Sequence, residues 1–295
     1  MTLDYASYET AHKDDYLALL REAWGRGSMS RREFEWWFER NPAGSLMSVA
    51  RTNGRIVGVA SHSLYRAVLE GEEQLVSFSV HATTHASARG RGVFQELERK
   101  HEREAQERGA ACVLAFASAP TAPLFLGPLG WTEVGRLRIW VRPVGFPGSL
   151  PTLDQIVARF DRHGDAAADW PNHVIRDAAY LNWRYLDSPR DYVALANDDE
   201  YAVIGHKLHK GRRIALVADL VARNPRRLLR TCVGAVQRRT HLLFALPAPE
   251  QRAAYALAGF VPTPMTLHFM GKALAGRLNP DPRAWRFTLG DTDFF

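Results

Sequence analysis

The strongest constraint on the fold of this chain is a stretch in which a strand-like segment, a glycine-rich turn and an amphipathic segment follow one another. Residues 75–81 (LVSFSVH) are apolar and β-branched enough to form a β-strand. The turn at 89–92 (RGRG) is followed at 93–108 by apolar residues at helical spacing, and Gly109 ends the pattern. Glycines let a backbone approach a ligand closely, and the first amides of a helix lack partners within the helix. The stretch therefore predicts an anion site, of the kind that usually binds phosphate.

The same stretch resembles the acetyl-CoA loop of the GNAT acyltransferases, whose signature is Gln/Arg-x-x-Gly-x-Gly/Ala at the start of a helix. Arg89 and Gly92 match this signature, and Phe94 stands where the family usually has a second small residue. The segments that follow keep the family's order: an apolar run suited to a buried parallel strand, a short helix with a Gly-aromatic pair, and a last strand. These segments are expected at 111–118, 122–131 and 132–141.

Upstream of the loop, the sequence predicts two helices and a meander of strands, which is the order that the resemblance implies. The first helix is expected at 14–24, and a capping box at 30–33 (SRRE) begins the second, which stops before Pro42. Asn53-Gly54 is a strong hairpin signal. The strands are expected at 46–50, 56–63, 64–69 and 75–81.

The second half of the chain repeats the first at a distance of 147 residues, without a gap. A repeat at this distance indicates a duplicated domain rather than a solenoid. The alternative is coincidence between two helix–turn–hairpin units, of which the second has its hairpin turn at 197–199. The shift aligns Trp36 with Trp183, Phe38 with Tyr185, Pro42 with Pro189, Val57 with Ile204 and Gly58 with Gly205.

The second copy differs from the first where the anion site is expected. After the strand at 214–221 comes the segment 222–228, which contains no glycine and in which Pro225 lacks an amide hydrogen. We therefore expect the second domain to lack the phosphate-binding turn. Its later parts are expected as a strand at 242–246, a helix at 249–257, the pair Gly259-Phe260 and a strand at 265–270.

The fold class predicted from these patterns is α/β (α+β): two GNAT-like domains in tandem, each a mixed, mostly antiparallel sheet flanked by helices. The composition changes around Pro143 and Pro151, which marks a linker. A helix is expected after it, carrying Leu153, Ile156, Val157 and Phe160. The expected parts are an N-terminal domain with the acyl-CoA loop at 1–145, a linker and helix at 146–172, a degenerate C-terminal domain at 173–275 and a tail at 276–295.

Composition narrows the classes of function. The chain of 295 residues has a net charge of +6 and no run of 18 apolar residues, so we expect no membrane span. Residues 1–4 lack the features of a signal peptide, and Cys112 and Cys232 lie in apolar runs, which predicts buried free thiols in a cytoplasmic protein. The basic charge suits a polyanion such as CoA, an anionic substrate or nucleic acid. It is spread along the chain rather than gathered in one tract, so nucleic acid stays a minor alternative among the partners. The oligomeric state stays open.

The resemblance implies the direct transfer of an acetyl group from acetyl-CoA, as co-substrate, to an unidentified small-molecule amine. It places the pyrophosphate of CoA on the turn and the first turn of the helix, and the pantetheine beside the end of the preceding strand. The residues concerned are Arg89, Gly90, Arg91, Gly92, Val93 and Phe94 for the pyrophosphate, and Ala82, Thr83 and Thr84 for the pantetheine.

For the chemistry, the strand offers His81 as a candidate general base, because an imidazole titrates near neutral pH. The alternative is that His81 is only a polar residue near a strand end. The family often has a tyrosine that acts as an acid toward the departing thiolate. Residues 119–127 contain no tyrosine, so Ser118, Thr121 or water would take that role.

Two other functions stay open at this stage. One is acyl or aminoacyl transfer from a carrier-bound or tRNA-bound donor, which the basic charge favours. The other is a non-catalytic CoA-binding module, which the missing tyrosine and Phe94 favour. The spacing of His163, His206 and His209 does not indicate a metal site, so none is expected.

Overall fold

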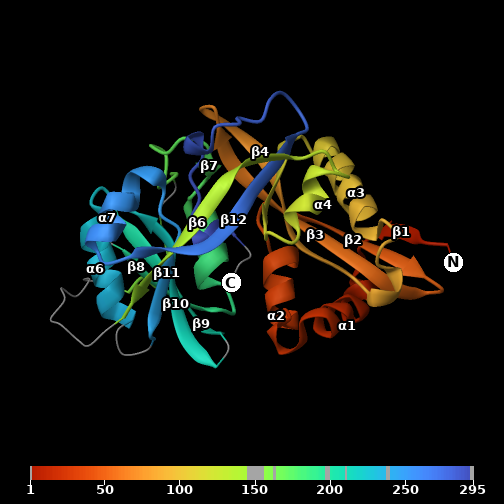
Figure 1. Cartoon of the computed structure of the whole chain (residues 1–295), viewed down its shortest axis with the longest axis horizontal. Coiled ribbons are helices and arrows are strands. Elements are labelled where there is room, and N and C mark those ends of the chain that lie inside the picture. The colour runs from red at the N-terminus through yellow and green to blue at the C-terminus, as the bar shows by residue number, and fades with distance from the viewer. Residues whose placement is uncertain are drawn as a thin grey trace. The chain divides into compact units, whose positions relative to one another are not determined.

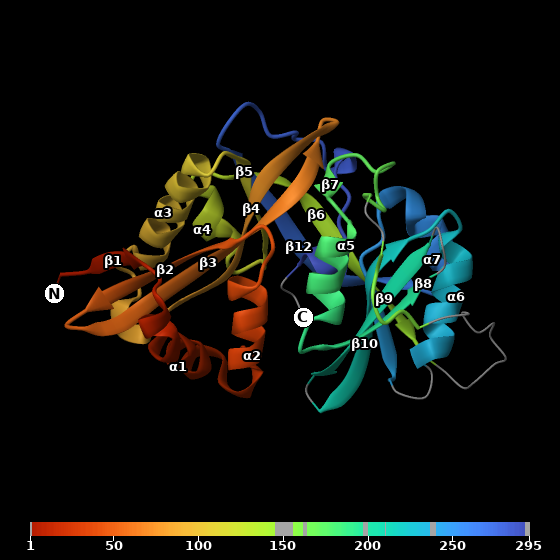
Figure 2. The ribbon, with the colours of Figure 1, turned by 180° about the vertical axis from the view of Figure 1, so that it is seen from behind.

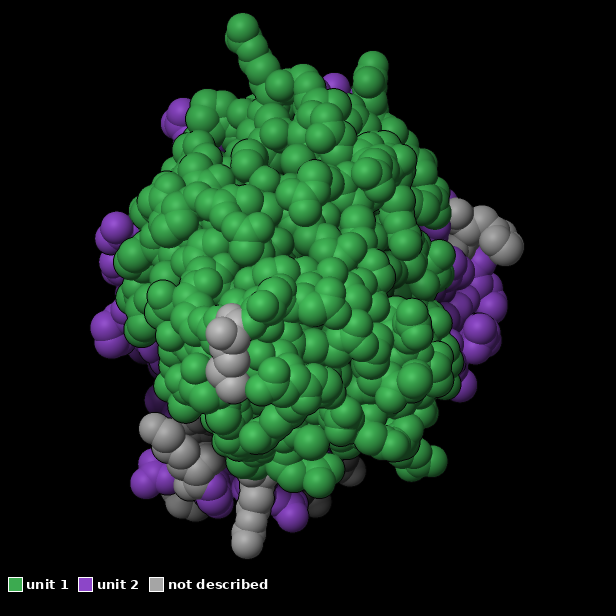
Figure 3. Space-filling view, turned by 90° about the vertical axis from the view of Figure 1, so that its right-hand side faces the viewer, with its two compact units in different colours: residues 1–67, 72–135, 268–280 green, residues 68–71, 136–267, 281–295 purple. Residues whose placement is uncertain are grey.

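The computed structural model describes residues 2–144, 156–161, 164–196, 200–209, 211–236 and 240–292. The chain divides into two compact units, each assembled from three segments of sequence and coloured separately in Figure 3. The first unit comprises Met1–Ala67, Glu72–Gly135 and His268–Pro280. The second comprises Val68–Gly71, Arg136–Leu267 and Asp281–Phe295.

The sheet of the first unit combines segments from distant parts of the chain. Its strands lie in the order β1 (Asp4–Ser7), β2 (Ser45–Thr52), β3 (Arg55–Leu69), β4 (Glu72–Thr84), β5 (Ala110–Ala117) and the last residues of β12 (Val261–Ala273). Strands β4 and β5 pair in parallel, whereas the pairs β1–β2, β2–β3 and β5–β12 are antiparallel. The prediction of a parallel strand after the glycine turn is therefore confirmed.

The β2–β3 hairpin turns at the predicted Asn53-Gly54, where both residues have positive φ, 50° and 76°. This is the conformation that a two-residue type I′ turn requires, which explains the residue types. The prediction of two strands at 56–63 and 64–69 is wrong, because β3 is one strand of 15 residues. The predicted break between Ser63 and Leu64 falls on neither a glycine nor a proline, so nothing in the sequence ends the strand there.

Helices cover both faces of the first unit's sheet. Figures 1 and 2 show α1 and α2 on one face and α3 and α4 on the other. The predicted capping box begins α2: Glu33 donates its amide to Ser30 Oγ, and the amide of Ser30 donates to the Glu33 carboxylate. The helices are α1 (Lys13–Trp24), α2 (Arg31–Phe34) with a π-helical turn (Glu35–Glu39), α3 (Val93–Glu107) and α4 (Ala122–Leu126).

The second unit has a corresponding sheet. The first residues of β12 lie beside β6, where Thr263 Oγ1 donates to the carbonyl of Ile139 at 2.8 Å. From there the strands run β6 (Thr132–Pro143), β11 (Leu242–Ala245), β10 (Arg212–Val221), β9 (Tyr201–His209) and β8 (Asp191–Ala196). The remaining elements are β7 (His173–Val174), α5 (Ala178–Leu181) with a π-helical turn (Asn182–Leu186), α6 (Pro225–Val236) and α7 (Arg252–Leu257).

The predicted duplication agrees with the structure in detail. Adding 147 to the bounds of α2 and of its π-helical turn gives the bounds of α5 and of its π-helical turn. The aligned glycines, Gly58 and Gly205, are also required for the same physical reason, which is lack of space for a side chain. A side chain on Gly58 would collide with Val93, and one on Gly205 would meet the ring of Tyr192 at 2.9 Å. Both copies therefore need glycine where another side chain crosses the strand.

Two predictions about the second half need correction or lie outside the described residues. The predicted linker helix is not observed over residues 156–161; instead Ile156 bridges Leu195, and the amide of Val157 donates to the carbonyl of Ala194. Ile156 and Val157 are β-branched, so an extended conformation beside β8 suits them. Residues 145–155 and the predicted hairpin turn at 197–199 lie outside the described residues.

The predicted division into parts at 1–145, 146–172, 173–275 and 276–295 stays a prediction. Strands β6 and β12 each contribute residues to both units, with the division after Gly135 and after Leu267. In the predicted tail, Trp285 and Phe287 are buried and stack at 5.7 Å, while residues 293–295 lie outside the described part. In the described parts of the chain, no helix has both the length and the apolar character needed to cross a membrane.

Candidate active site

The glycine turn connects the end of β4 to the start of α3 and is open to solvent. Gly90 and Gly92 have φ of 72° and 75°, a region that favours glycine. A Cβ built at either position would meet no atom within 4 Å. The turn therefore exposes its backbone instead of packing it against the body of the unit.

Helix α3 begins at this turn without a cap from any described side chain. Gly92 is its N-cap residue and has no side chain to offer, so the first amides, those of Val93, Phe94 and Gln95, are available to an external acceptor. The helix is nevertheless held firmly, because Val93 and Leu97 are buried in a core cluster. The Phe94 ring packs edge-on against Phe125 of α4, with 5.3 Å between the ring centroids, so this large side chain packs against another helix. The other members of the cluster are Ala50, Val57, Ala60 and Ala88.

Two arginines flank the turn. Arg89 and Arg91 are both exposed, and Arg89 Nε donates to the carbonyl of Thr84 at 3.2 Å. This bond fixes the arginine stem at the end of β4 while its charge stays near the helix N-terminus. The positive end of the helix dipole and the two guanidinium groups act in the same direction, in favour of an anion.

Strand β4 extends beyond its parallel partner just before this turn. The β4–β5 register runs from Leu75 with Ala110 to Ser79 with Ala115. The last residues of β4, including the predicted site residues Ala82, Thr83 and Thr84, continue past that pairing and are half-buried. On its other edge β5 pairs with β12, up to Ala117 with His268.

His81 lies on this last part of β4 among aromatic rings. Its imidazole is 5.4 Å from Trp24, 5.8 Å from Trp37 and 6.2 Å from Phe38, measured between ring centroids. Trp37 and Phe38 are buried, as expected for core aromatics, while Trp24 is 42% exposed. The histidine therefore lies between the core and an exposed tryptophan.

Ser118 follows β5, and its hydroxyl interacts locally. Its Oγ lies 3.0 Å from Thr121 Oγ1, and the Thr121 hydroxyl also donates to the carbonyl of Ser118 at 3.1 Å. The structure thus brings together the two hydroxyls that the sequence offered in place of the tyrosine. The predicted cofactor-binding residues lie at the end of β4, at 82–84, and around the glycine turn, at 89–94, with the short turn Ala86–Ala88 between them.

The two cysteines are confirmed as buried free thiols. Burial raises the pKa of Cys112 to about 12 and that of Cys232 to about 12, so neither thiol ionises near neutral pH. A nucleophilic role for either cysteine is therefore unsupported.

The second unit shows why its corresponding helix end is closed. At the N-terminus of α6, the Glu200 carboxylate accepts from the amides of Arg223 and Asn224, at 3.0 and 3.2 Å. Arg227 donates to the same carboxylate at 2.5 Å. A carboxylate of the protein itself therefore lies on the two amides that precede Pro225, the first residue of α6. The sequence showed that this segment has no glycine and that Pro225 lacks an amide hydrogen. It did not indicate Glu200, which lies 23 residues before Arg223.

We expect Glu200→Gln to destabilise the protein by about 1–2 kcal/mol at pH 7, because a neutral amide is a weaker partner for Arg227 and the helix dipole. Burial by itself raises the pKa of Glu200, but Arg227 and the two backbone amides outweigh it, so the pKa is lowered overall. A lowered folded pKa gives stability that is present above the unfolded value and is lost as pH falls. Denaturant unfolding at pH 7 and near pH 3 should therefore show the two proteins converging in acid; an equal difference at both values would contradict this role.

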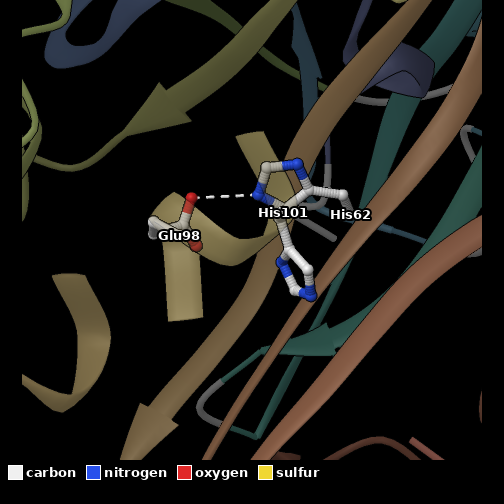
Figure 4. Close-up of side chains that lie close together, drawn as sticks. All are labelled: His62, Glu98 and His101. Carbon is white, nitrogen blue, oxygen red and sulfur yellow. Dashed lines mark hydrogen bonds and ion pairs between the residues drawn. The ribbon is translucent and has the colours of Figure 1, made fainter. Parts of the chain in front are cut away.

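The sequence analysis missed one polar cluster, which consists of His62, Glu98 and His101 (Figure 4). Glu98 and His101 are three residues apart on α3, and His62 lies on β3. The spacing of Glu98 and His101 on one helix face is visible in the sequence. No nearby residue indicates that His62, which lies 36 residues before Glu98, would join them.

The family model of the acetyltransferase (GNAT) domain matches residues 4–134. The search of curated proteins found no match. Among solved structures, the chain is similar to a GCN5-related N-acetyltransferase from Anabaena variabilis, with a TM-score of 0.65 and 10% identity over 92% of this chain and 73% of that one.

Two further structures extend this similarity. One is the Saccharomyces cerevisiae N-myristoyltransferase with bound myristoyl-CoA, with a TM-score of 0.64 and 11% identity over 91% of this chain and 78% of that one. The other is a tandem GNAT protein from the clavulanic acid biosynthesis pathway, with a TM-score of 0.61 and 15% identity over 94% of this chain and 100% of that one. At these identities the structures establish the fold, and the family model establishes the family of the N-terminal region. Residues 4–134 therefore belong to the acetyltransferase (GNAT) family, and the chain as a whole has the tandem GNAT fold.

Proposed function

We propose that the protein transfers an acetyl group from acetyl-CoA to the amine of a small molecule. The family supports acyl transfer in general. The observation that carries the choice of a CoA thioester is the difference between the two helix ends. The N-terminus of α3 is open beside Arg89 and Arg91, whereas that of α6 is occupied by Glu200.

In this proposal, the pyrophosphate of acetyl-CoA accepts hydrogen bonds from the amides at residues 89–94. The pantetheine extends along Ala82–Thr84, the part of β4 that continues past the β5 register. A β-strand edge offers backbone donors and acceptors, and the pantetheine amides have the matching groups. The thioester would then lie close to His81.

The chemistry needs a neutral amine, because a protonated amine has no lone pair for attack. His81 would accept the ammonium proton, directly or through water. The amine nitrogen then forms a bond to the acetyl carbonyl carbon, and the carbon–sulfur bond breaks with the electron pair leaving on sulfur. The proton that the nitrogen loses as the amide forms would pass to this sulfur and give the free thiol of CoA. The Ser118 hydroxyl would donate to the departing thiolate. Most of the rate enhancement would come from holding both reactants in place.

The test is thiol release from acetyl-CoA across a panel of primary amines, with His81→Gln beside the wild type. We expect turnover with at least one amine, and a fall in kcat of about 100-fold in the variant with little change in KM for acetyl-CoA. His268→Gln is the matched control, since His268 pairs with Glu133 and should leave kcat unchanged. Binding without turnover for any amine would contradict catalysis, and absence of CoA binding would point to a carrier-bound or tRNA-bound donor.

A non-catalytic CoA-binding module is the second candidate, and one observation favours it. The segment 119–127 contains no tyrosine, and the Ser118 hydroxyl already interacts with Thr121. The amine panel separates the two candidates directly. We place the protein in the cytoplasm as part of the same proposal, because its two buried thiols suit a reducing compartment.

A further inference from the structure

A cluster of three potential metal ligands lies in the interior of the first unit, between β3 and α3. His62, Glu98 and His101 are each 0% exposed. One nitrogen of each imidazole and one oxygen of the carboxylate lie within 4.8 Å of one another. Figure 4 shows the His62 ring directed at the Glu98 carboxylate, with the His101 ring beside it. The rings are 4.6 Å apart between centroids and inclined at 63°.

Each of these side chains is held from behind by a serine hydroxyl. His62 Nδ1 lies 2.9 Å from Ser77 Oγ, and His101 Nε2 lies 2.9 Å from Ser48 Oγ. Ser79 Oγ donates to Glu98 Oε1 at 3.2 Å. These bonds leave His62 Nε2, Glu98 Oε2 and His101 Nδ1 on the inner side. Metal-binding histidines and carboxylates are typically oriented by a hydrogen bond at their other polar atom in this way.

The inner atoms are incompletely satisfied by the protein itself. His62 Nε2 and Glu98 Oε2 are 2.9 Å apart and bind each other. Among the described residues, no partner reaches the buried His101 Nδ1, and no lysine or arginine reaches the Glu98 carboxylate. A buried nitrogen without a partner is costly, and a buried carboxylate needs positive charge nearby.

The hydrogen bond of His101 also suits a metal ligand. If the ring's proton is on Nε2, where Ser48 can accept it, Nδ1 presents a lone pair to the centre of the cluster.

We propose that His62, Glu98 and His101 bind a divalent transition-metal ion, for which zinc is the best match. Two imidazoles and one carboxylate are a known zinc ligand set. Bonds of about 2.0–2.2 Å place tetrahedral ligand atoms about 3.3–3.6 Å apart. The His62 and Glu98 ligand atoms, 2.9 Å apart, would therefore move slightly apart, the longest separation in the cluster, up to 4.8 Å, would shorten, and one enclosed water would complete the set. Because the site has no solvent exposure, the ion would be structural, tying β3 to the helix that follows the glycine turn.

A fully enclosed site is filled while the chain folds, so the experiment compares refolding conditions. The untagged full chain is unfolded in guanidinium with a chelator, then refolded with zinc or with the chelator still present. After desalting, we expect about one zinc per chain by mass spectrometry and a higher Tm for the zinc-refolded sample. Refolding with Co(II) should give the intense visible bands of a four-coordinate ion.

The matched variants are His101→Gln and His268→Gln. His101→Gln is expected to lose at least nine-tenths of the bound zinc, and His268→Gln, which removes a histidine from a simple histidine–glutamate pair, should retain it. If His101→Gln fails to fold, the Co(II) spectrum and the Tm difference of the wild type decide. A wild type that folds equally well in chelator and carries no stoichiometric zinc would overturn the proposal and leave a plain His62–Glu98 hydrogen bond.

Discussion

Gly92→Glu is expected to weaken acetyl-CoA binding by about 100-fold while leaving the protein folded. The glutamate side chain would project from the N-cap of α3 into the space where the pyrophosphate is proposed to bind, because nothing else lies within 4 Å of a Cβ at this position. It would compete for the same helix amides and repel the phosphate charge. Hydrogen bonds to charged groups contribute about 1.5–3 kcal/mol each, so loss of one or two accounts for the expected factor.

The control for this variant is Gly109→Glu, at the other end of the same helix. Gly109 has φ of 79° and equally open space around it, so both variants carry the same strain of a left-handed glutamate. Calorimetric titration with acetyl-CoA should show near wild-type affinity for Gly109→Glu. Equal affinity in the two variants would show that the glycine turn does not bind CoA, even if the protein proves to be an acyltransferase.

Local sequence signals predicted most elements of the fold because the physics behind them is local. The capping box at Ser30, the Asn53-Gly54 turn and the strand before Gly90 all depend on neighbours within a few residues. The duplication could be read from aligned aromatics, since a repeat preserves spacing even where the environment changes. The glycine at 58 and its counterpart at 205 are the clearest example, because different side chains crowd them.

Long-range pairings could not be predicted in the same way. The last residues of β12 complete the first unit's sheet beside β5, although about 150 residues separate the paired positions, such as Ala117 and His268. The same limit applies to the sites. Glu200 closes the end of α6 and His62 meets Glu98 only because strands place them there. The sequence identified which residue types were missing from a motif, but not which distant residue replaced them.

Arg176→Met is expected to produce the largest loss of stability, about 3–5 kcal/mol, through the polar core of the second unit. Arg176 Nε lies 3.1 and 3.2 Å from the two oxygens of Asp219, and its Nη2 donates to Asp291 at 2.7 Å. All three side chains are 0% exposed. Tyr185 donates to Asp219 and Tyr180 to Asp291, but neither hydroxyl supplies charge. Methionine would fill the volume and leave two buried carboxylates without the guanidinium that pairs with both.

The pH dependence of Arg176→Met separates lost charge from lost packing. Burial already raises the pKa of Asp219, and without the guanidinium the Asp219 carboxyl would be protonated more readily in the folded state. An acid with a raised folded pKa loses stability as pH rises, so the deficit relative to wild type should be small near pH 4 and grow toward pH 7. Denaturant unfolding near pH 4 and at pH 7 measures this deficit. The control is Arg283→Met, which removes an arginine from an exposed pair with Asp281 and should show no change in stability. Adding Asp219→Asn and Asp291→Asn should restore part of the stability; a deficit independent of pH would mean that Arg176 acts through packing alone.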